Sequence, residues 1–290
     1  MSQKIIGFAL LLQPLKKVSV RQFLISFSSV FGAIWLFLEP ASFFLPERLN
    51  FGSDGYLVLV GVSLLIALWQ NRPKLCVSRK LTSPDTQVEI RVGDLFDQNA
   101  HLVIGLNDAF DTEIGEIIRD SSVQGQFLTR VYRRDQQQLD IDIETVLQAD
   151  NRDRKFAQNK AYGKPWRHRI GTTVTLGSHE KRFFLTVYGY MNNDLTVKSS
   201  PDYISTALDE LWQEMRRKCH GTEVAMPIIG SDLARTGLSR MQLAKLIISS
   251  FIVESKRRFI TCKLTIMIYP KDLDNVDLYE LQEFLKSACF

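Results

Sequence analysis

Polar side chains and a glycine-bearing stretch follow three short apolar runs, and at these positions the sequence could do chemistry. Asp94 follows one run, Asn107 ends the next, and residues 230–237 follow a third. A carboxylate can accept from an adenine amino group or a ribose, and an amide can contact a ribose. A glycine-bearing loop that enters a helix can hold phosphate through backbone N–H groups, and Arg235 could add a charged contact. These residue types together predict a nucleotide site.

The elements that must position these residues alternate between short β-like runs and amphipathic helical ones. Strands are expected at residues 75–81, 88–92, 102–106, 172–176, 183–188, 224–229 and 264–269. Helices are expected at residues 124–133, 141–149, 201–218, 239–255 and 275–288. Ser200 and Ser239 precede two of these helices, and serine is a preferred N-cap residue. Pro201 follows Ser200, and proline is favoured at the first position of a helix.

This alternation predicts an α/β fold, with a largely parallel or mixed sheet flanked by helices. In open sheets of this class the ligand lies beyond the carboxyl ends of the strands. We therefore expect Asp94, Asn107 and the 230–237 loop to lie at one edge of the sheet. The polar stretch 151–169 is interpreted as a surface loop, with residues 160–166 folding over the site.

A membrane region is expected before this domain, in residues 1–72, leaving residues 73–290 as the ligand-binding domain. The stretches 23–38 and 56–69 carry no charge, and a spanning helix needs about 20 mostly apolar residues. We place a helical hairpin at about 21–39 and 54–70. Glu39-Pro40 ends the first uncharged stretch, which is long enough to span if Val20 and residues 43–45 are counted at its ends. Either segment alone would also fit a buried core helix, and the second is short.

The flanks of the two apolar segments predict their orientation. Basic residues precede the first and follow the second, whereas the connecting loop is mostly acidic. Because Lys and Arg stay preferentially on the cytoplasmic side, both chain ends are expected there. Small residues recur at four-residue spacing, as in Ser28 and Gly32 or Ser63 and Ala67, which favours association of helices and a homo-oligomer.

Composition excludes several classes of function. The net charge is +4 and the basic clusters are scattered, so no nucleic-acid partner is expected. The four cysteines and four histidines lie far apart, without metal-ligand spacing or a disulfide framework. We therefore expect no metal and no catalytic base–nucleophile pair.

Three segments resemble the macro-domain family: IRVGDLF, LVIGLNDAFDT and AMPIIGSDLARTGLS. In that family an Asp holds adenine, an Asn ends the next strand, and a glycine-rich loop wraps phosphate and the distal ribose. By position Asp94, Asn107 and residues 230–237 match these roles. The segment GLNDAFDTEIGEIIRDSSVQGQF, residues 105–127, resembles the macro-domain effectors of Thoeris anti-phage defence, in the branch with two N-terminal transmembrane helices.

The resemblance implies a function. A TIR-domain partner would consume NAD and release an ADP-ribose-derived signal, in this branch histidine–ADP-ribose. The macro domain would bind that signal, and the membrane region would then disrupt the bacterial inner membrane and abort the infection. The protein would be a multi-pass effector in the bilayer, with no cofactor beyond its ADP-ribose-type ligand. Direct contact with the partner is not implied.

The expected ligand-binding residues combine the residue pattern with the resemblance. They are Asp94, Leu95, Asn107, Phe110, Asp111, Ser121, Gly125, Gln126, Gly230, Ser231, Asp232, Arg235, Thr236 and Gly237. Ser121, Gly125 and Gln126 enter only through the resemblance, since the serines alone would be read as helix caps. Phe110 could belong to the core or form an aromatic platform for a base of the ligand. Asp111 or Glu113 is hypothesised to pair with an amino or imidazolium group of the ligand.

One departure from the macro-domain pattern bears on catalysis. Macro-domain hydrolases usually follow the asparagine with a run of glycines, and here the bulky, acidic stretch 108–113 takes that place. We therefore expect binding without catalysis. The alternative is a membrane-tethered ADP-ribosyl hydrolase or another enzyme that processes NAD metabolites.

Overall fold

The computed structural model describes residues 20–44, 52–71, 75–150, 154–231 and 236–289. The chain divides into two compact units, Met1–Lys74 and Leu75–Phe290. We describe each unit by itself. Expectations for residues 1–19 and for Asp232 and Arg235 lie outside the described residues.

The first unit contains a helical hairpin, α2 (Val20–Phe44) and α3 (Ser53–Gln70). The segments Phe23–Phe44 and Ser53–Gln70 are long and apolar enough to span a membrane, with mean hydropathies of 1.6 and 1.5. The two helices pack on each other, with Phe31 edge-on to Tyr56 at 6.1 Å between ring centroids. Leu59, Ser63 and Ala67 form the buried stripe of α3. Ser63 and Ala67 are therefore buried within the hairpin, whereas Ser28 and Gly32 of α2 are exposed.

The first helix is longer than the predicted bounds of about 21–39, because α2 begins at Val20 and continues through Pro40 to Phe44. A proline removes one backbone hydrogen bond, but it does not stop a helix whose other carbonyls find donors. The hydroxyl of Ser42 donates to the carbonyl of Glu39 at 2.8 Å.

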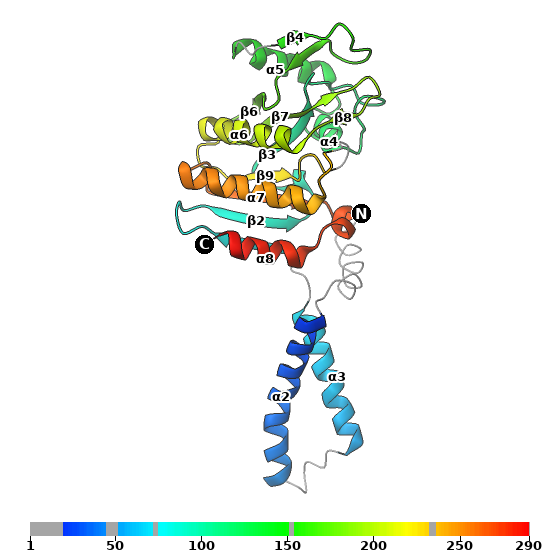
Figure 1. The fold of residues 1–290 in the computed structure, drawn as a ribbon, viewed down its shortest axis with the longest axis vertical. Coiled ribbons are helices and arrows are strands. Elements are labelled where there is room, and N and C mark those ends of the chain that lie inside the picture. The colour runs from blue at the N-terminus through cyan, green and yellow to red at the C-terminus, as the bar shows by residue number, and fades with distance from the viewer. Residues whose placement is uncertain (1–19, 45–51, 72–74, 151–153, 232–235, 290) are drawn as a thin grey trace. The chain divides into compact units, whose positions relative to one another are not determined.

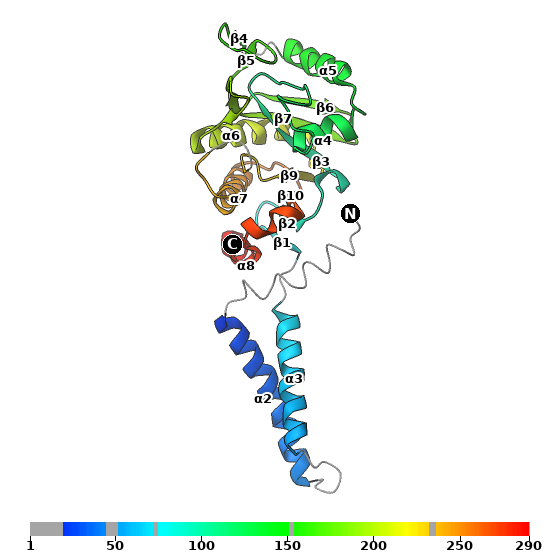
Figure 2. The ribbon, with the colours of Figure 1, turned by 90° about the vertical axis from the view of Figure 1, so that its right-hand side faces the viewer.

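The second unit is built on a mixed sheet in the order β1-β2-β10-β9-β3-β7-β6, with β8 paired to β7 (Figures 1 and 2). The strands are β1 (Cys76–Lys80), β2 (Gln87–Val92), β3 (His101–Asn107), β6 (Thr173–Gly177), β7 (Arg182–Met191), β8 (Val197–Lys198), β9 (Val224–Pro227) and β10 (Lys263–Ile268). The pairings from β2 through β10, β9 and β3 to β7 are all parallel, and β1, β6 and β8 are antiparallel to their neighbours. The predicted α/β class with a mixed sheet is confirmed.

Helices cover both faces of this sheet, as the side view shows (Figure 2). One face carries α6 (Pro201–Lys218), α7 (Arg240–Arg257) and α8 (Leu278–Ala288), and the other α4 (Val123–Arg130) and α5 (Gln136–Ala149). Short 3-10 helices are η2 (Leu95–Asp97) and η3 (Pro270–Asn275). The predicted helix starts are confirmed, because Ser200 caps α6 ahead of Pro201 and Ser239 forms a capping box with Gln242 on α7.

The segment predicted as a surface loop is partly ordered as a hairpin. β4 (Arg154–Phe156) pairs antiparallel with β5 (Trp166–His168). Residues 154–169 are called the strap below. The three-residue strands are too short to show an alternating pattern, which is why the sequence did not predict them.

Candidate functional site

The parallel strands bring the predicted site segments to one edge of the sheet. The carboxyl ends of β2, β10, β9, β3 and β7 are followed by Gly93-Asp94, Tyr269, residues 228–231, Asp108 and Asn192 respectively. Ile268 pairs with Val92, and the N–H of Gly93 donates to the carbonyl of Ile268 at 3.0 Å. Because neighbouring strands lie about 4.8 Å apart, the ends of β2 and β3 are separated by about 14 Å, with β10 and β9 between them.

Asp94 is half-buried at one end of this edge. Its side chain accepts from the N–H of Phe96 at 2.8 Å and caps η2. Its second oxygen accepts from Arg130 of α4 at 2.6 Å, and the same guanidinium lies 5.0 Å from the centroid of the Phe96 ring. Arg130 was not predicted, because only the fold brings α4 against η2. The side chain of the neighbouring Leu95 is buried in the core.

Asn107 ends β3 and is 2% exposed. Its side-chain oxygen accepts from the N–H groups of Ala109 and Asp111 at 3.0 and 3.3 Å. Its amino group has no hydrogen-bond partner among the described residues. A buried donor without a partner costs about 1–3 kcal/mol, so this amino group is the polar group at the end of β3 that lacks an acceptor among the described residues.

Phe110 and Asp111 follow Asn107 and are both buried. The ring of Phe110 is 1% exposed and packs edge-on against His168, so it belongs to the core and is not an aromatic platform at the surface. The carboxylate of Asp111 pairs with Lys160 of the strap at 3.0 Å, and both side chains are 1% exposed. Asp111 is therefore paired with a cation of the chain itself, and its pairing with a ligand group stays a prediction. Glu113 is exposed.

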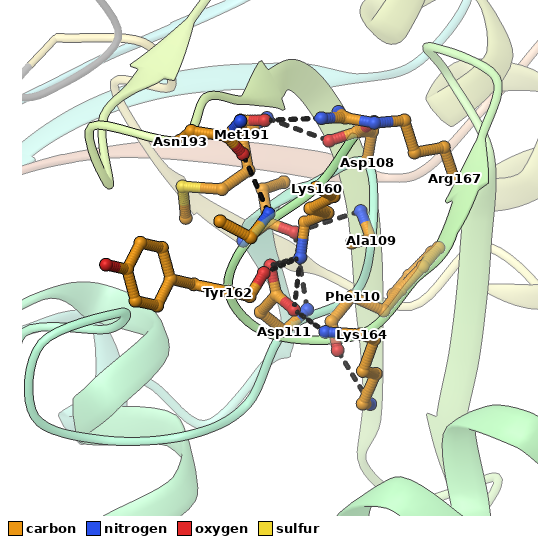
Figure 3. Close-up of polar contacts among 12 residues, drawn as sticks. Asp108, Ala109, Phe110, Asp111, Lys160, Tyr162, Lys164, Arg167, Met191 and Asn193 are labelled. Atoms are coloured by element: carbon orange, nitrogen blue, oxygen red, sulfur yellow. Dashed lines mark hydrogen bonds and ion pairs between the residues drawn. The ribbon is translucent and has the colours of Figure 1, made fainter. Parts of the chain in front are cut away.

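The strap lies against residues 108–111 through a set of charged contacts (Figure 3). The N–H of Lys164 donates to Asp111 at 2.6 Å, and its ammonium group donates to the carbonyl of Phe110 at 2.8 Å. Arg167 pairs with the buried Asp108 at 2.5 Å. The folding of residues 160–166 against the Asn107 loop therefore agrees with expectation, although the cations responsible were not singled out in the sequence.

The segment 121–126 begins α4 next to the Asn107 loop. Ser122 is the N-cap and accepts from the N–H of Gly125 at 3.0 Å, while Gln126 donates to the carbonyl of Ser121 at 3.1 Å. The side chain of Gln124 donates to the carbonyl of Asp111. A Cβ added to Gly125 would lie 2.4 Å from the carbonyl oxygen of Arg119, so only glycine fits there. The start of α4 is thus held against the loop that follows Asn107 by the contact between Gln124 and Asp111.

The loop after β9 leads into the start of α7. Gly230 and Gly237 have φ of +79° and +74°, a region that glycine adopts without strain. Thr236 is buried, and its hydroxyl accepts from the N–H of Leu238 at 3.2 Å. Ser231 lies beside Gly230 in the described part of the loop.

Tyr269 was missed as a site residue. It follows β10, is 45% exposed, and by strand register lies beside the Gly93-Asp94 turn. The sequence signal was present, because Tyr269 ends a predicted strand, but only the strand order places it next to Asp94. Among the residues that the structure describes, no group of three His, Cys, Asp or Glu side chains could hold a metal ion.

His168 predicts a pH dependence of stability. It is 4% exposed, burial lowers its pKa below the ordinary value of 6.5, and Glu144, Arg154 and Lys164 are the charged groups that act on it. The unfolded chain therefore binds more protons than the folded chain as the pH falls below 6.5. This stabilisation is complete above that pH and is lost as the pH falls through the folded pKa.

We expect the melting temperature of a fragment of residues 75–290 to fall between about pH 7 and about pH 5.5. The fall should be smaller in His168→Gln than in wild type, as measured by thermal unfolding at several pH values. His179→Gln is the matched control, because His179 is exposed. An unchanged pH slope in His168→Gln would show that His168 does not contribute.

Comparison with known proteins gives one family. A family model described as "Thoeris protein ThsA, Macro domain" matches residues 88–269. The Thoeris protein ThsA of Bacillus amyloliquefaciens (strain Y2) is 25% identical over 244 residues, which cover 80% of this chain and 79% of that protein. A solved variant of the Oceanobacillus iheyensis macrodomain with ADPR is 14% identical, with a TM-score of 0.46, over 73% of this chain and 100% of that chain. The same macrodomain with ADP is 12% identical, with a TM-score of 0.43, over 74% and 99%.

Proposed function

The chain belongs to the family of Thoeris ThsA macro-domain proteins, and from this premise we propose that it is an anti-phage effector that senses an ADP-ribose derivative. The ligand would lie along the carboxyl edge of the sheet. Asp94 and Tyr269 would meet the adenine end, residues 230–237 the diphosphate, and Asn107 the distal ribose. The unit binds and does not catalyse in this proposal.

The linear order of groups along the edge is the observation that carries the proposal. An Asp with a neighbouring Tyr follows β2 and β10, and a glycine-bearing loop follows β9. An amide whose amino group has no partner among the described residues ends β3. Adenosine, diphosphate and second ribose are joined in this same order in ADP-ribose. A separation of about 14 Å between the ends of β2 and β3 suits an extended molecule better than a mononucleotide.

The signal would be histidine–ADP-ribose made by a TIR-domain NADase, as the family resemblance implies. The membrane response would be a shift in population, since a ligand drives a conformational change only by binding one state better than another. The helices α2 and α3 would span the bacterial inner membrane with both chain ends on the cytoplasmic side. Two helices are too few to line a pore, so membrane disruption and abortive infection would need a homo-oligomer, for which the exposed face of α2 around Ser28 and Gly32 is available.

Thermal unfolding of a fragment of residues 75–290 tests ligand binding. ADP-ribose, histidine–ADP-ribose, cyclic ADP-ribose and NAD are added in turn. A ligand at about 100 times its Kd stabilises the native state by about 2.7 kcal/mol, which raises the melting temperature by about 5–10 °C for a unit of this size. A shift confined to ADP-ribose derivatives is expected. No shift with any of them, in the fragment and in the detergent-solubilised full chain, would rule out the proposal.

The same samples test whether the unit is a binding protein or a hydrolase. After prolonged incubation with histidine–ADP-ribose the ligand should be recovered intact by chromatography. Release of histidine by wild type and not by Asn107→Ala would favour the membrane-tethered hydrolase instead.

A further inference from the structure

The orientation of the Asn107 side chain depends on the loop that follows it. The side-chain oxygen accepts from the N–H groups of Ala109 and Asp111, and the carbonyl of Asn107 accepts from the N–H of Phe110 at 3.1 Å. Phe110 has a φ of +50°, so the chain turns sharply within these residues. Because two backbone donors take the oxygen, the amino group is the part of the amide left for a ligand. Any shift of Asp111 would remove one of the donors that set this orientation.

The strap determines where Asp111 lies. The ammonium group of Lys160 lies 3.0 and 3.1 Å from the two carboxylate oxygens and also donates to the carbonyl of Tyr162 at 2.6 Å. The strap can approach this closely because residue 163 is glycine, with a φ of +74°. A Cβ at Gly163 would lie 2.2 Å from an oxygen of Asp111.

From these contacts we infer that Lys160 is a positioning residue for ligand binding. By holding the carboxylate of Asp111, it fixes the backbone N–H that orients the Asn107 amide. This inference rests on the proposed function and extends it to a residue 53 positions away from Asn107 that does not itself contact the ligand. The ion pair is buried, so the fold sets its geometry and water does not replace either partner.

Other contacts keep the strap in place when Lys160 is changed. Lys164 pairs with Asp140 at 2.5 Å, and Arg167 pairs with Asp108. The N–H of His168 donates to the carbonyl of Asp108 at 2.7 Å. Loss of the Lys160 ammonium group therefore leaves the strap attached but removes the counter-charge of the Asp111 carboxylate, which keeps the N–H of Lys164 as its donor. The expected consequence is a local shift of Asp111 and a less well-oriented Asn107.

Isothermal calorimetry on the full-length protein in detergent, with ADP-ribose and ADP as probes, tests this inference. Lys160→Met should weaken ADP-ribose binding about tenfold, as expected for the loss of one hydrogen bond, and change ADP binding less than about twofold. The reason is that ADP lacks the distal ribose that Asn107 would contact. Lys155→Met is the matched control, because Lys155 is exposed on the same hairpin, and it should alter neither affinity.

A double-mutant cycle distinguishes positioning from a general structural effect. In an Asn107→Ala background, Lys160→Met should change ADP-ribose affinity by less than about twofold, because the residue through which it acts is gone. Equal losses with and without Asn107, or equal losses for ADP and ADP-ribose, would overturn the inference. If Lys160→Met does not fold, Lys160→Gln, which keeps a donor near Asp111, should show a smaller loss with the same selectivity. Wild-type protein that binds neither probe would instead overturn the proposed function.

Discussion

Replacing Asp111 with alanine is expected to lower the free energy of unfolding of the unit Leu75–Phe290 by about 3–5 kcal/mol. The carboxylate is the partner of Lys160 at 3.0 Å in an ion pair whose side chains are both 1% exposed. It also accepts from the N–H of Lys164 at 2.6 Å. Removing one member of such a pair leaves a charge away from water with no counter-charge, and this penalty outweighs the small loss of packing. Denaturant unfolding of a fragment of residues 75–290 measures the effect.

A matched control is available in the same region. Glu144 pairs with Arg154 of the strap at 2.7 Å, but the side chains are 42% and 36% exposed. Water screens such a pair, so Glu144→Ala should cost no more than about 1 kcal/mol. Similar losses in the two variants would mean that the Asp111–Lys160 pair is not sheltered from solvent as the structure shows.

Replacing Asn107 with alanine is expected to weaken ADP-ribose binding about 100-fold, or about 2.7 kcal/mol. The variant loses the amino group proposed to meet the distal ribose. It also leaves the N–H groups of Ala109 and Asp111 without their acceptor, so the loop loses its orientation. Calorimetric titration of ADP-ribose into the full-length protein in detergent measures the affinity. Asn159→Ala, at an exposed position of the strap, should bind as wild type does.

Asn107→Asp separates the two roles of the side chain. Aspartate keeps an oxygen for the two backbone donors but replaces the amino donor with an anionic oxygen. If the donor meets the ligand, this variant should bind ADP-ribose at least as weakly as Asn107→Ala. Affinity close to wild type in Asn107→Asp would assign the side chain to loop structure alone.

Local signals predicted most of the framework. The predicted strand 88–92 and helix 201–218 agree with β2 and α6 to within a residue. The signals that predicted them, apolar periodicity and the Ser200-Pro201 helix start, depend only on residues that are near one another in the sequence. The same kind of signal failed at Pro40, which is compatible with a continuing helix, and at β4 and β5, which are too short to carry a period.

The family and the positions of Asp94, Asn107 and the 230–237 loop at strand ends could be determined from the sequence, because each depends on residues close together in the chain. The partners of these residues were decided only by the tertiary structure. Arg130 reaches Asp94 across 36 positions, and Lys160 reaches Asp111 across 49. Whether a carboxylate is open to a ligand or already neutralised by the chain depends on which cation the fold brings within hydrogen-bonding distance. Sequence spacing does not specify such long-range pairs, because many exposed Lys and Arg residues could serve equally well until packing selects one.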